Sequence, residues 1–306
     1  MSEGDRPAIP PELGQARERF LEMVGELRPA LHRYCARLVG STVDGEDVVQ
    51  DSLAKALYAI SLASEPPALR PWLFRIAHNT AIDFLRRYEH SRVERRADLD
   101  ETAAEPDPAV DPAVVRASLS SFLELPVRQR SAVILKDVLG HSLAEAADTM
   151  GTTIPAVKAA LVRGRAALRA QAAGLTRAAE MDPAERARLD RYAALFNARD
   201  WDALRSLMSE ECQLDLVSKA ARRGPAVRGY VARYAAEDVR VAVGAVEGRP
   251  ALLVFTGEIG ASPPAYFILL EWSGDQVSAI RDYRYAAYVA GEAEMVLSDT
   301  PAARWQ

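Results

Sequence analysis

The stretch RPWLFRIAHNTAIDFLRR, residues 70–87, carries two different faces if it forms one regular helix. At about 100° per residue, one face collects mainly apolar residues that we expect to meet a core: Leu73, Ala77, Thr80, Ala81 and Phe84. A second face collects aromatic and polar residues: Trp72, Arg75, Asn79, Asp83 and Arg86. Tryptophan offers a stacking surface, arginine a planar cation and asparagine a paired donor and acceptor, which together suit nucleic acid with accessible bases. A surface helix with one half-buried tryptophan is the alternative for this segment taken alone.

The formal net charge of −5 hides an uneven distribution of charge along the 306 residues. Residues 70–96 carry seven arginines and three acids, and residues 151–177 carry five basic residues and no acid. Between these blocks, residues 97–112 carry six acids, three prolines and no basic residue, which predicts a flexible linker. Two basic blocks separated by an acidic spacer predict two contacts on one polyanion.

The second basic block has the pattern of a helix-turn-helix. Ser142 is placed to begin a short helix, Gly151 breaks it, and Thr152 or Thr153 is placed to cap the next helix, which we expect to end near residue 170. We expect three basic side chains to project from that second helix: Lys158, Arg163 and Arg165. An ordinary αα-hairpin is the alternative, but the absence of acids over 151–177 favours DNA.

A third stretch, DGEDVVQDSLAKALYAI, residues 44–60, predicts a helix with Asp44 as its N-cap. Its outer face collects an acidic and polar patch: Glu46, Asp47, Gln50 and Asp51. Because this patch repels phosphate, we expect it to bind a basic protein partner if the chain binds DNA. A well-capped surface helix is the alternative reading of this segment alone.

The character of the chain changes after residue 180. Asp182 and Pro183 mark a helix start, and one or two helices are expected over 183–209. Five segments with strand character follow: 212–217, 239–248, 251–259, 265–272 and 276–285. Helices followed by a run of strands predict a separate α+β domain.

Other features of the composition exclude several classes of protein. Two distant cysteines, Cys35 and Cys212, argue against a disulfide framework or a cysteine-rich metal site, and we expect two buried thiols. The sequence has no run of 18 apolar residues, and its N-terminus has no signal-peptide pattern. We therefore expect a cytoplasmic protein without a membrane partner.

Taken in order, EDVVQDSLAKAL, PWLFRIAHNTAIDFLRR, the acidic linker and LPVRQRSAVILKDVLGHSLAEAADTMGTTIPAVKAALVRGRAALR resemble the bacterial extracytoplasmic-function (group IV) sigma factors. The resemblance covers about residues 15–172. It implies two all-α domains, with sigma region 2 over 1–96 and the region 4 helix-turn-helix over 113–176, joined by the linker 97–112. The implied function is to bind core RNA polymerase, recognise the −35 and −10 promoter elements and start transcription.

The resemblance also implies roles for individual residues. The acidic patch matches the surface that binds the β′ clamp of core polymerase: Glu46, Asp47, Gln50 and Asp51. The 70–87 helix matches the segment that melts and reads the −10 element, through Trp72, Arg75, Asn79, Arg86 and Arg87. The second helix of the helix-turn-helix matches the −35 reader, through Thr152, Thr153, Lys158, Arg163 and Arg165.

Three further details of the resemblance matter. The loop 61–69 matches the loop that captures a flipped base, and contact with the polymerase β flap is also implied. Ala159 and Ala160 stand where many members carry a polar pair in the recognition helix. Thymine-methyl contacts and DNA shape would then carry more of the −35 readout.

Residues 182–306 resemble the SnoaL-like branch of the NTF2-like fold, through a helix, a turn motif (Asn197, Asp200, Trp201 and Leu204) and the run of strands. The resemblance implies a curved sheet wrapped by helices into a cone with an apolar pocket. It also implies a built-in regulator that contacts regions 2 and 4. The candidate pocket residues are Tyr192, Trp201, Asp215, Tyr266 and Trp272.

This C-terminal segment has no histidine, because all four histidines precede residue 142. A His–Asp pair or a histidine-ligated metal site is therefore excluded within it. Asp215 and Asp282 lie on expected strands, and we expect them to face outward or to pair with Arg281 or Arg284. We expect no enzyme activity, no metal and no cofactor.

Two other functions remain open at this point. A one-component helix-turn-helix regulator with a small-molecule-sensing tail would need neither the acidic helix nor a second DNA module. An enzyme with a DNA-targeting segment is disfavoured by the missing histidines.

Overall fold

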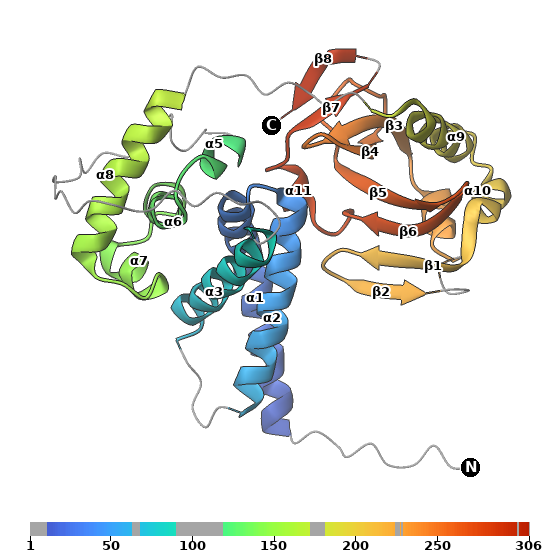
Figure 1. Cartoon of the computed structure of the whole chain (residues 1–306). Helices are drawn as coiled ribbons and strands as arrows, with labels where there is room; N and C mark the ends of the chain where they lie inside the picture. Colours follow the sequence, from blue (N-terminus) through green and yellow to red (C-terminus); the bar gives the residue numbers. More distant parts are fainter. Residues whose placement is uncertain are drawn as a thin grey trace. The chain divides into compact units, whose positions relative to one another are not determined.

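The computed structural model describes residues 11–62, 68–89, 119–171, 181–223, 227, 229–298 and 300–305. The chain divides into two compact units, Met1–Gly174 and Leu175–Gln306. Unit 1 is helical and unit 2 is α+β, which confirms the predicted fold class (Figure 1). The expected linker 97–112 and residues 63–67 of the loop expected to capture a flipped base lie outside the described residues. The finer domain boundaries stay a prediction.

Three long helices form the first part of unit 1: α1 (Pro11–Val39), α2 (Thr42–Leu62) and α3 (Leu69–Glu89). Helix α2 begins at Thr42, and the Ser41 hydroxyl accepts a hydrogen bond of 3.2 Å from the Asp44 amide. The prediction that Asp44 is the N-cap is therefore wrong, because Ser41 already caps a helix that begins two residues earlier. Helices α1 and α2 cross closely at Gly45, where a Cβ atom would stand 2.6 Å from the Ala36 backbone.

The second part of unit 1 consists of short helices and one long one: α5 (Leu119–Leu123), α6 (Val127–Val133), the π-helix η1 (Ile134–Val138), α7 (Leu143–Thr149) and α8 (Ile154–Gln171). Ser142 and Glu145 form a capping box at the start of α7. Gly151 takes φ +60° in the turn, and the Thr153 hydroxyl accepts from the Ala156 amide at 3.4 Å. The predicted helix-turn-helix is confirmed.

Both groups of helices in unit 1 share one hydrophobic core. Tyr34, Phe74, Phe122, Ile134 and Leu161 are among its most buried members. Arg130 on α6 connects the two groups, because it donates to the carbonyl of Leu38 on α1 and, at 2.9 Å each, to those of Leu123 and Leu125. Unit 1 is thus closed as one packed body.

Unit 2 begins with α9 (Pro183–Asn197) and α10 (Trp201–Leu207). Pro183 occupies the first helical position as predicted, although the Asp182 side chain makes no capping hydrogen bond. The strands and short helices that follow are β1 (Met208–Leu216), β2 (Ala220–Arg223), η3 (Val231–Ala236), β3 (Val239–Val246), β4 (Arg249–Thr256), β5 (Tyr266–Ser273), β6 (Gln276–Asp282), α11 (Ala287–Ala290), β7 (Met295–Leu297) and β8 (Thr300–Trp305).

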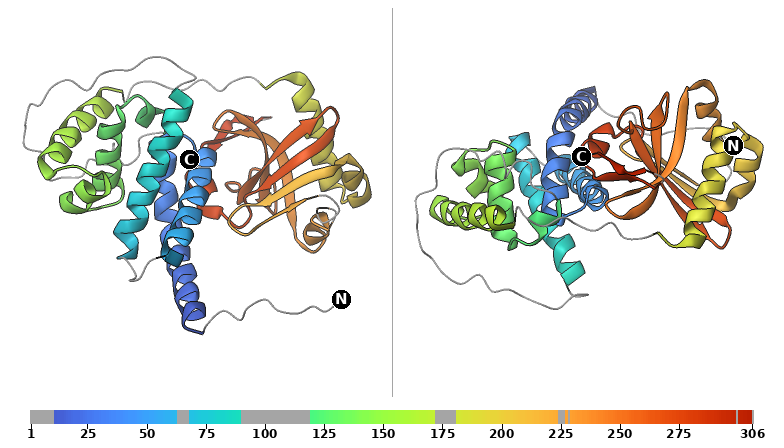
Figure 2. Two further views of the ribbon diagram at one scale, coloured as in Figure 1. Left: turned by 60° about the horizontal axis from the view of Figure 1, so that its bottom comes forward. Right: turned by 90° about the horizontal axis from the view of Figure 1, so that it is seen from above.

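The strands form one curved sheet with the order β2-β1-β6-β5-β4-β3-β7-β8 (Figure 2). Strands β1 and β6 pair in parallel, and the other neighbours pair antiparallel. The five strands expected from the sequence are confirmed. The described residues of this unit and of unit 1 include no helix that is long and apolar enough to span a bilayer.

The turn motif between α9 and α10 anchors these helices to the sheet. The Asn197 side chain donates to the Val241 carbonyl at 2.8 Å and accepts from the Val241 amide at 2.9 Å. Asp200 caps α10 by accepting from the Ala203 amide at 3.1 Å. Trp201 packs edge-on against Phe196 with ring centroids 5.4 Å apart. The motif therefore has a structural role: it fixes the corner between two helices against β3.

Candidate nucleic-acid and polymerase interface

The polar face of α3 is exposed along most of its length. Asn79, Arg86 and Arg87 are exposed, whereas Trp72 is half-buried against the core. The Arg87 side chain donates to the carbonyl of Asp83 one turn earlier, at 3.3 Å. Two arginines and one asparagine are therefore exposed on this face beside a half-buried tryptophan. This arrangement fits the predicted nucleic-acid face and also the alternative of a surface helix with one half-buried tryptophan.

Arg75 is placed differently from its neighbours on this face. Its guanidinium forms an ion pair with Asp148 of α7, and each side chain is about half exposed. Beside this pair, Phe74 packs edge-on against His141 with ring centroids 4.8 Å apart. Helix α7 therefore covers part of the α3 face in this arrangement of unit 1.

The outer face of α2 differs from the predicted acidic patch at one position. Asp51 is exposed, and Asp47 and Gln50 are half-buried. The prediction that Glu46 belongs to the outer surface is wrong: its side chain is fully buried in an ion pair with Arg28 of α1. Glu46 follows Gly45 at the close crossing of α1 and α2, and this turns its side chain toward α1.

Tyr58 was missed by the sequence reasoning. It is 70% exposed and stands seven residues after Asp51, so it lies on the same side of α2. Leu57, beside it, is 42% exposed. Following the helix face of Asp47 and Asp51 for two further turns would have identified this aromatic residue.

The helix-turn-helix presents four of its five predicted −35 residues to solvent. Thr152 and Thr153 are exposed, and Lys158 and Arg163 are half-buried. The prediction that the fifth residue, Arg165, projects toward DNA is wrong. Its side chain is buried and donates to both carboxylate oxygens of Asp137, at 2.8 and 2.6 Å. This pair ties α8 to the π-helix η1, and so Arg165 cannot reach DNA while region 4 stays folded.

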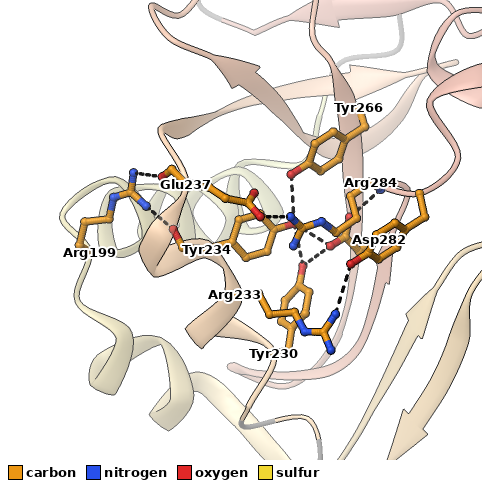
Figure 3. Close-up of polar contacts among 9 residues, drawn as sticks. Arg199, Tyr230, Arg233, Tyr234, Glu237, Tyr266, Asp282 and Arg284 are labelled. Atoms are coloured by element: carbon orange, nitrogen blue, oxygen red, sulfur yellow. Dashed lines mark hydrogen bonds and ion pairs between the residues drawn. The ribbon is translucent and has the colours of Figure 1, made fainter.

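In unit 2, a buried carboxylate organises the polar contacts that Figure 3 shows. Asp282 at the end of β6 is fully buried and accepts from the hydroxyls of Tyr230 at 2.8 Å and Tyr234 at 2.6 Å. The Arg284 amide donates to its other oxygen at 2.9 Å. Burial raises the pKa of Asp282, and these three hydrogen bonds counteract that rise.

Arg284 closes the network on its outer side. Its guanidinium pairs with Glu237 and lies over the ring of Tyr234, 4.7 Å from the centroid. Tyr266 donates to the Tyr234 hydroxyl at 3.3 Å. These contacts fasten η3 to the end of β6. The described residues contain no group of three or more histidine, cysteine, aspartate or glutamate residues that could hold a metal ion.

The five expected pocket residues make different contacts in the structure. Asp215 pairs with Arg281 at 3.3 Å, as the sequence reasoning favoured. Trp201 and Trp272 are both half-buried, and the guanidinium of Arg188 lies over the Trp272 ring, 5.6 Å from its centroid.

Two of the five approach the buried carboxylate. Tyr266 belongs to the network around Asp282, and Tyr192 is fully buried, where burial and the Asp282 charge raise its pKa. The expectation that Asp282 faces outward or pairs with a cation is wrong. Asp282 points inward because it stands opposite Ile268 and Leu216, whose side chains are buried.

A basic and aromatic helix face, followed by a helix-turn-helix in the same body, fits a protein that reads promoter DNA, and the comparisons with known families give its class. Sigma-70 region 2 matches residues 23–91, and Sigma-70 region 4 matches residues 120–168. The chain belongs to the ECF RNA polymerase sigma factors, since it is 30% identical to SigJ of Mycobacterium tuberculosis over 253 residues, covering 77% of this chain and 78% of SigJ.

Another relative is similar over a longer stretch. SigG of Mycobacterium tuberculosis is 28% identical over 288 residues, covering 83% of this chain and 78% of SigG. The crystal structure of Mycobacterium tuberculosis SigJ aligns over 86% of this chain and 95% of its own, with 21% identity and a TM-score of 0.35. The alternative of a one-component regulator is not favoured, because region 2 matches as well as region 4.

Proposed function

We propose that this sigma factor contacts the −10 element through the exposed face of α3 and the −35 element through the start of α8. The single observation that carries the proposal is the α3 face, where Asn79, Arg86 and Arg87 are exposed beside the half-buried Trp72. Stacking and edge contacts suit melted bases, and the two terminal arginines suit phosphates. Arg75 joins these contacts once its ion pair with Asp148 is broken.

For the −35 element, the proposed contacts are Thr152, Thr153, Lys158 and Arg163. Arg165 is left out because it is committed to Asp137. Region 4 is also proposed to meet the β flap of polymerase. The alanines of α8 offer few hydrogen bonds to base edges, which favours apolar contacts and DNA shape in the readout.

The proposed polymerase surface is the outer face of α2, formed by Asp47, Gln50, Asp51 and the exposed Tyr58. Acidic side chains around an exposed aromatic residue fit a basic helical partner such as the β′ clamp. Glu46 supports this surface from within, through its buried pair with Arg28.

Unit 2 is proposed to act as a built-in regulator that contacts regions 2 and 4 and has no catalytic role. Sigma factors are not enzymes, and the buried carboxylate of this unit is satisfied by two tyrosines and a backbone amide. Regulation by unit 2 would bias unit 1 between its compact state and a state in which regions 2 and 4 span a promoter.

In-vitro transcription with core polymerase tests the proposal. The full chain is compared with a chain ending at Gly174 on the promoter of its own operon, and unit 1 retains its own core in that truncation. We expect transcripts from both, at different levels. Equal levels would contradict regulation by unit 2.

Core binding is tested separately. We expect the double substitution of Asp47→Arg and Asp51→Arg to weaken binding to core polymerase at least about tenfold, because like charges then oppose the basic partner. Glu26→Arg, which makes the same charge change as each single substitution at another exposed position of unit 1, is the control, and it is compared with Asp51→Arg alone as well as with the double variant. Unchanged core binding by the double variant would refute the proposed α2 surface.

A further inference from the structure

A cavity of about 560 Å³ lies within unit 1, between α3 and the helices α6 and α8. Its apolar wall is formed from both groups of helices: Ile82, Leu85, Val127, Met150, Ala156, Ala159 and Ala160. A volume of this size falls within the range of small-molecule sites, roughly 300–1,000 Å³. The cavity therefore has both the size and the lining to hold an organic molecule.

The charged residues that line this cavity are all arginines, although one of them, Arg86, also lies 3.9 Å from the carboxylate of Asp83 on the same helix. Arg86, Arg128 and Arg163 line the cavity, and none of its lining residues is acidic. His78 also lines it, but burial lowers the pKa of His78 to about 4, so the ring is neutral at pH 7. Ser131 and Thr152 add hydroxyl groups. Arginines beside an apolar wall select a ligand that is anionic at one end and apolar elsewhere.

We propose that this cavity binds an amphipathic organic anion, such as a medium-chain carboxylate, and that the bound anion holds regions 2 and 4 together. The site is complete only when α3 faces α6 and α8 across the cavity, because each contributes one part of the wall. A ligand with such contacts binds the compact state and not the separated one. It therefore stabilises the compact state, and the stabilisation grows with the logarithm of the ligand concentration once this exceeds the dissociation constant.

The same anion competes with DNA. Arg86, Thr152 and Arg163 line the cavity and are also among the proposed promoter contacts. The binding site itself does not depend on the proposed function, whereas its effect on transcription does. Occupancy would keep the factor silent by two routes, closure of unit 1 and direct cover of the DNA-contacting side chains.

Calorimetric titration of the full chain with sodium decanoate tests the site. We expect one-to-one binding with a dissociation constant below about 1 mM, and much weaker binding of 1-decanol and of acetate, which each lack one half of the required chemistry. Arg128→Gln should weaken decanoate binding about tenfold through loss of a charge-assisted contact. Arg169→Gln, the same change at an exposed position of α8 that does not line the cavity, should leave it unchanged.

A second variant, Ala159→Trp, fills the cavity and should abolish binding. If the Ala159→Trp variant does not fold, as judged by circular dichroism, decanoate binding by the Arg128→Gln variant alone decides the test. The proposal is overturned if decanoate does not bind below about 1 mM, or if it binds the Arg128 and Arg169 variants equally.

Transcription separates this inference from the proposed function. Decanoate should lower transcript levels of the full chain, and Arg128→Gln should need about tenfold more decanoate for the same effect. A chain that transcribes but binds no decanoate overturns the inference alone. A chain that binds decanoate but starts no transcripts overturns the proposed function and leaves the binding site intact.

Discussion

At the scale of single residues, a buried hydrogen bond between Tyr34 and His78 joins α1 to α3. The hydroxyl and the ring Nδ1 are 2.6 Å apart, and both side chains are buried. Burial lowers the pKa of His78 from 6.5 to about 4. It also lowers the pKa of His141, which packs against Phe74 at the contact between regions 2 and 4.

These lowered pKa values predict that acid destabilises unit 1. The unfolded chain takes up a proton on His78 near pH 6.5 and the folded chain only near pH 4, so the free energy of unfolding falls as the pH drops through this window. The loss due to His78 is on the order of 3 kcal/mol. Urea unfolding at pH 7.5 and pH 5 captures about 2 kcal/mol of this loss, because pH 5 lies about 1.5 units below the unfolded pKa and still above the folded one. His78→Gln should show a smaller difference between the two pH values. An equal difference in both chains would contradict the assignment.

The exposed polar positions of α3 could be predicted from their spacing along a regular helix, because polar side chains on the face opposite the core lie in water. The ion-pair partners of Glu46 and Arg165 could not be predicted, since these partners lie far away in sequence. Asp137 is 28 residues before Arg165 and sits in a π-helix, which changes the side-chain phase. Leu161, one turn before Arg165, was a signal that the arginine lies on the inner face.

At the scale of elements, the crossing of α1 and α2 depends on a residue without a side chain. A Cβ atom at Gly45 would stand 2.6 Å from the backbone of Ala36, and backbone atoms have no room to move aside. Because Glu46, the next residue, reaches Arg28 across the same contact, the crossing also fixes the buried ion pair.

We therefore predict that Gly45→Ala destabilises the chain by about 1–3 kcal/mol or more. Gly25→Ala is the matched control, because Gly25 lies in α1 with open space around its Cβ position. That control should stabilise the chain by about 0.5–1 kcal/mol through helix propensity. Thermal unfolding monitored by circular dichroism compares them, and two changes of the same sign would refute the close crossing.

Long elements were predictable from periodicity, and short ones were not. The strands β3 to β6 each carry several consecutive apolar or alternating residues. Strands β2, β7 and β8 are short, and they owe their pairing to neighbours elsewhere in the chain. The start of α2 was misplaced by two residues because Ser41 and Asp44 are both good caps, and sequence alone does not rank them.

At the scale of the whole molecule, an ion pair between α7 and α3 occupies part of the α3 surface that is proposed to bind DNA. Asp148 of α7 neutralises Arg75 of α3, and each side chain is about half exposed. The sequence predicted each surface separately, since periodicity is local. That α7 turns toward α3 follows from the shared core and from Arg130, and no local pattern encodes it.

Removing this contact should favour the open state. We predict that Asp148→Asn raises transcription at limiting sigma factor by up to about fivefold, because a half-exposed ion pair contributes at most about 1 kcal/mol. The gain should shrink as salt rises. Asp190→Asn, which removes an exposed ion pair within α9, is the control. Reduced or unchanged transcription by Asp148→Asn at low salt would exclude a restraining role for the pair.

The parallel pairing of β1 with β6 has a consequence for synthesis on the ribosome. Strand β1 can pair with β6 only after the residues up to Asp282 have left the ribosome, about 110 residues after α8 has been synthesised. At bacterial elongation rates this takes roughly 5 to 20 s. A newborn chain therefore passes through an interval in which its two sigma regions are complete and its C-terminal unit is not. If unit 2 is the regulator that we propose, a nascent chain meets polymerase during this interval without that restraint.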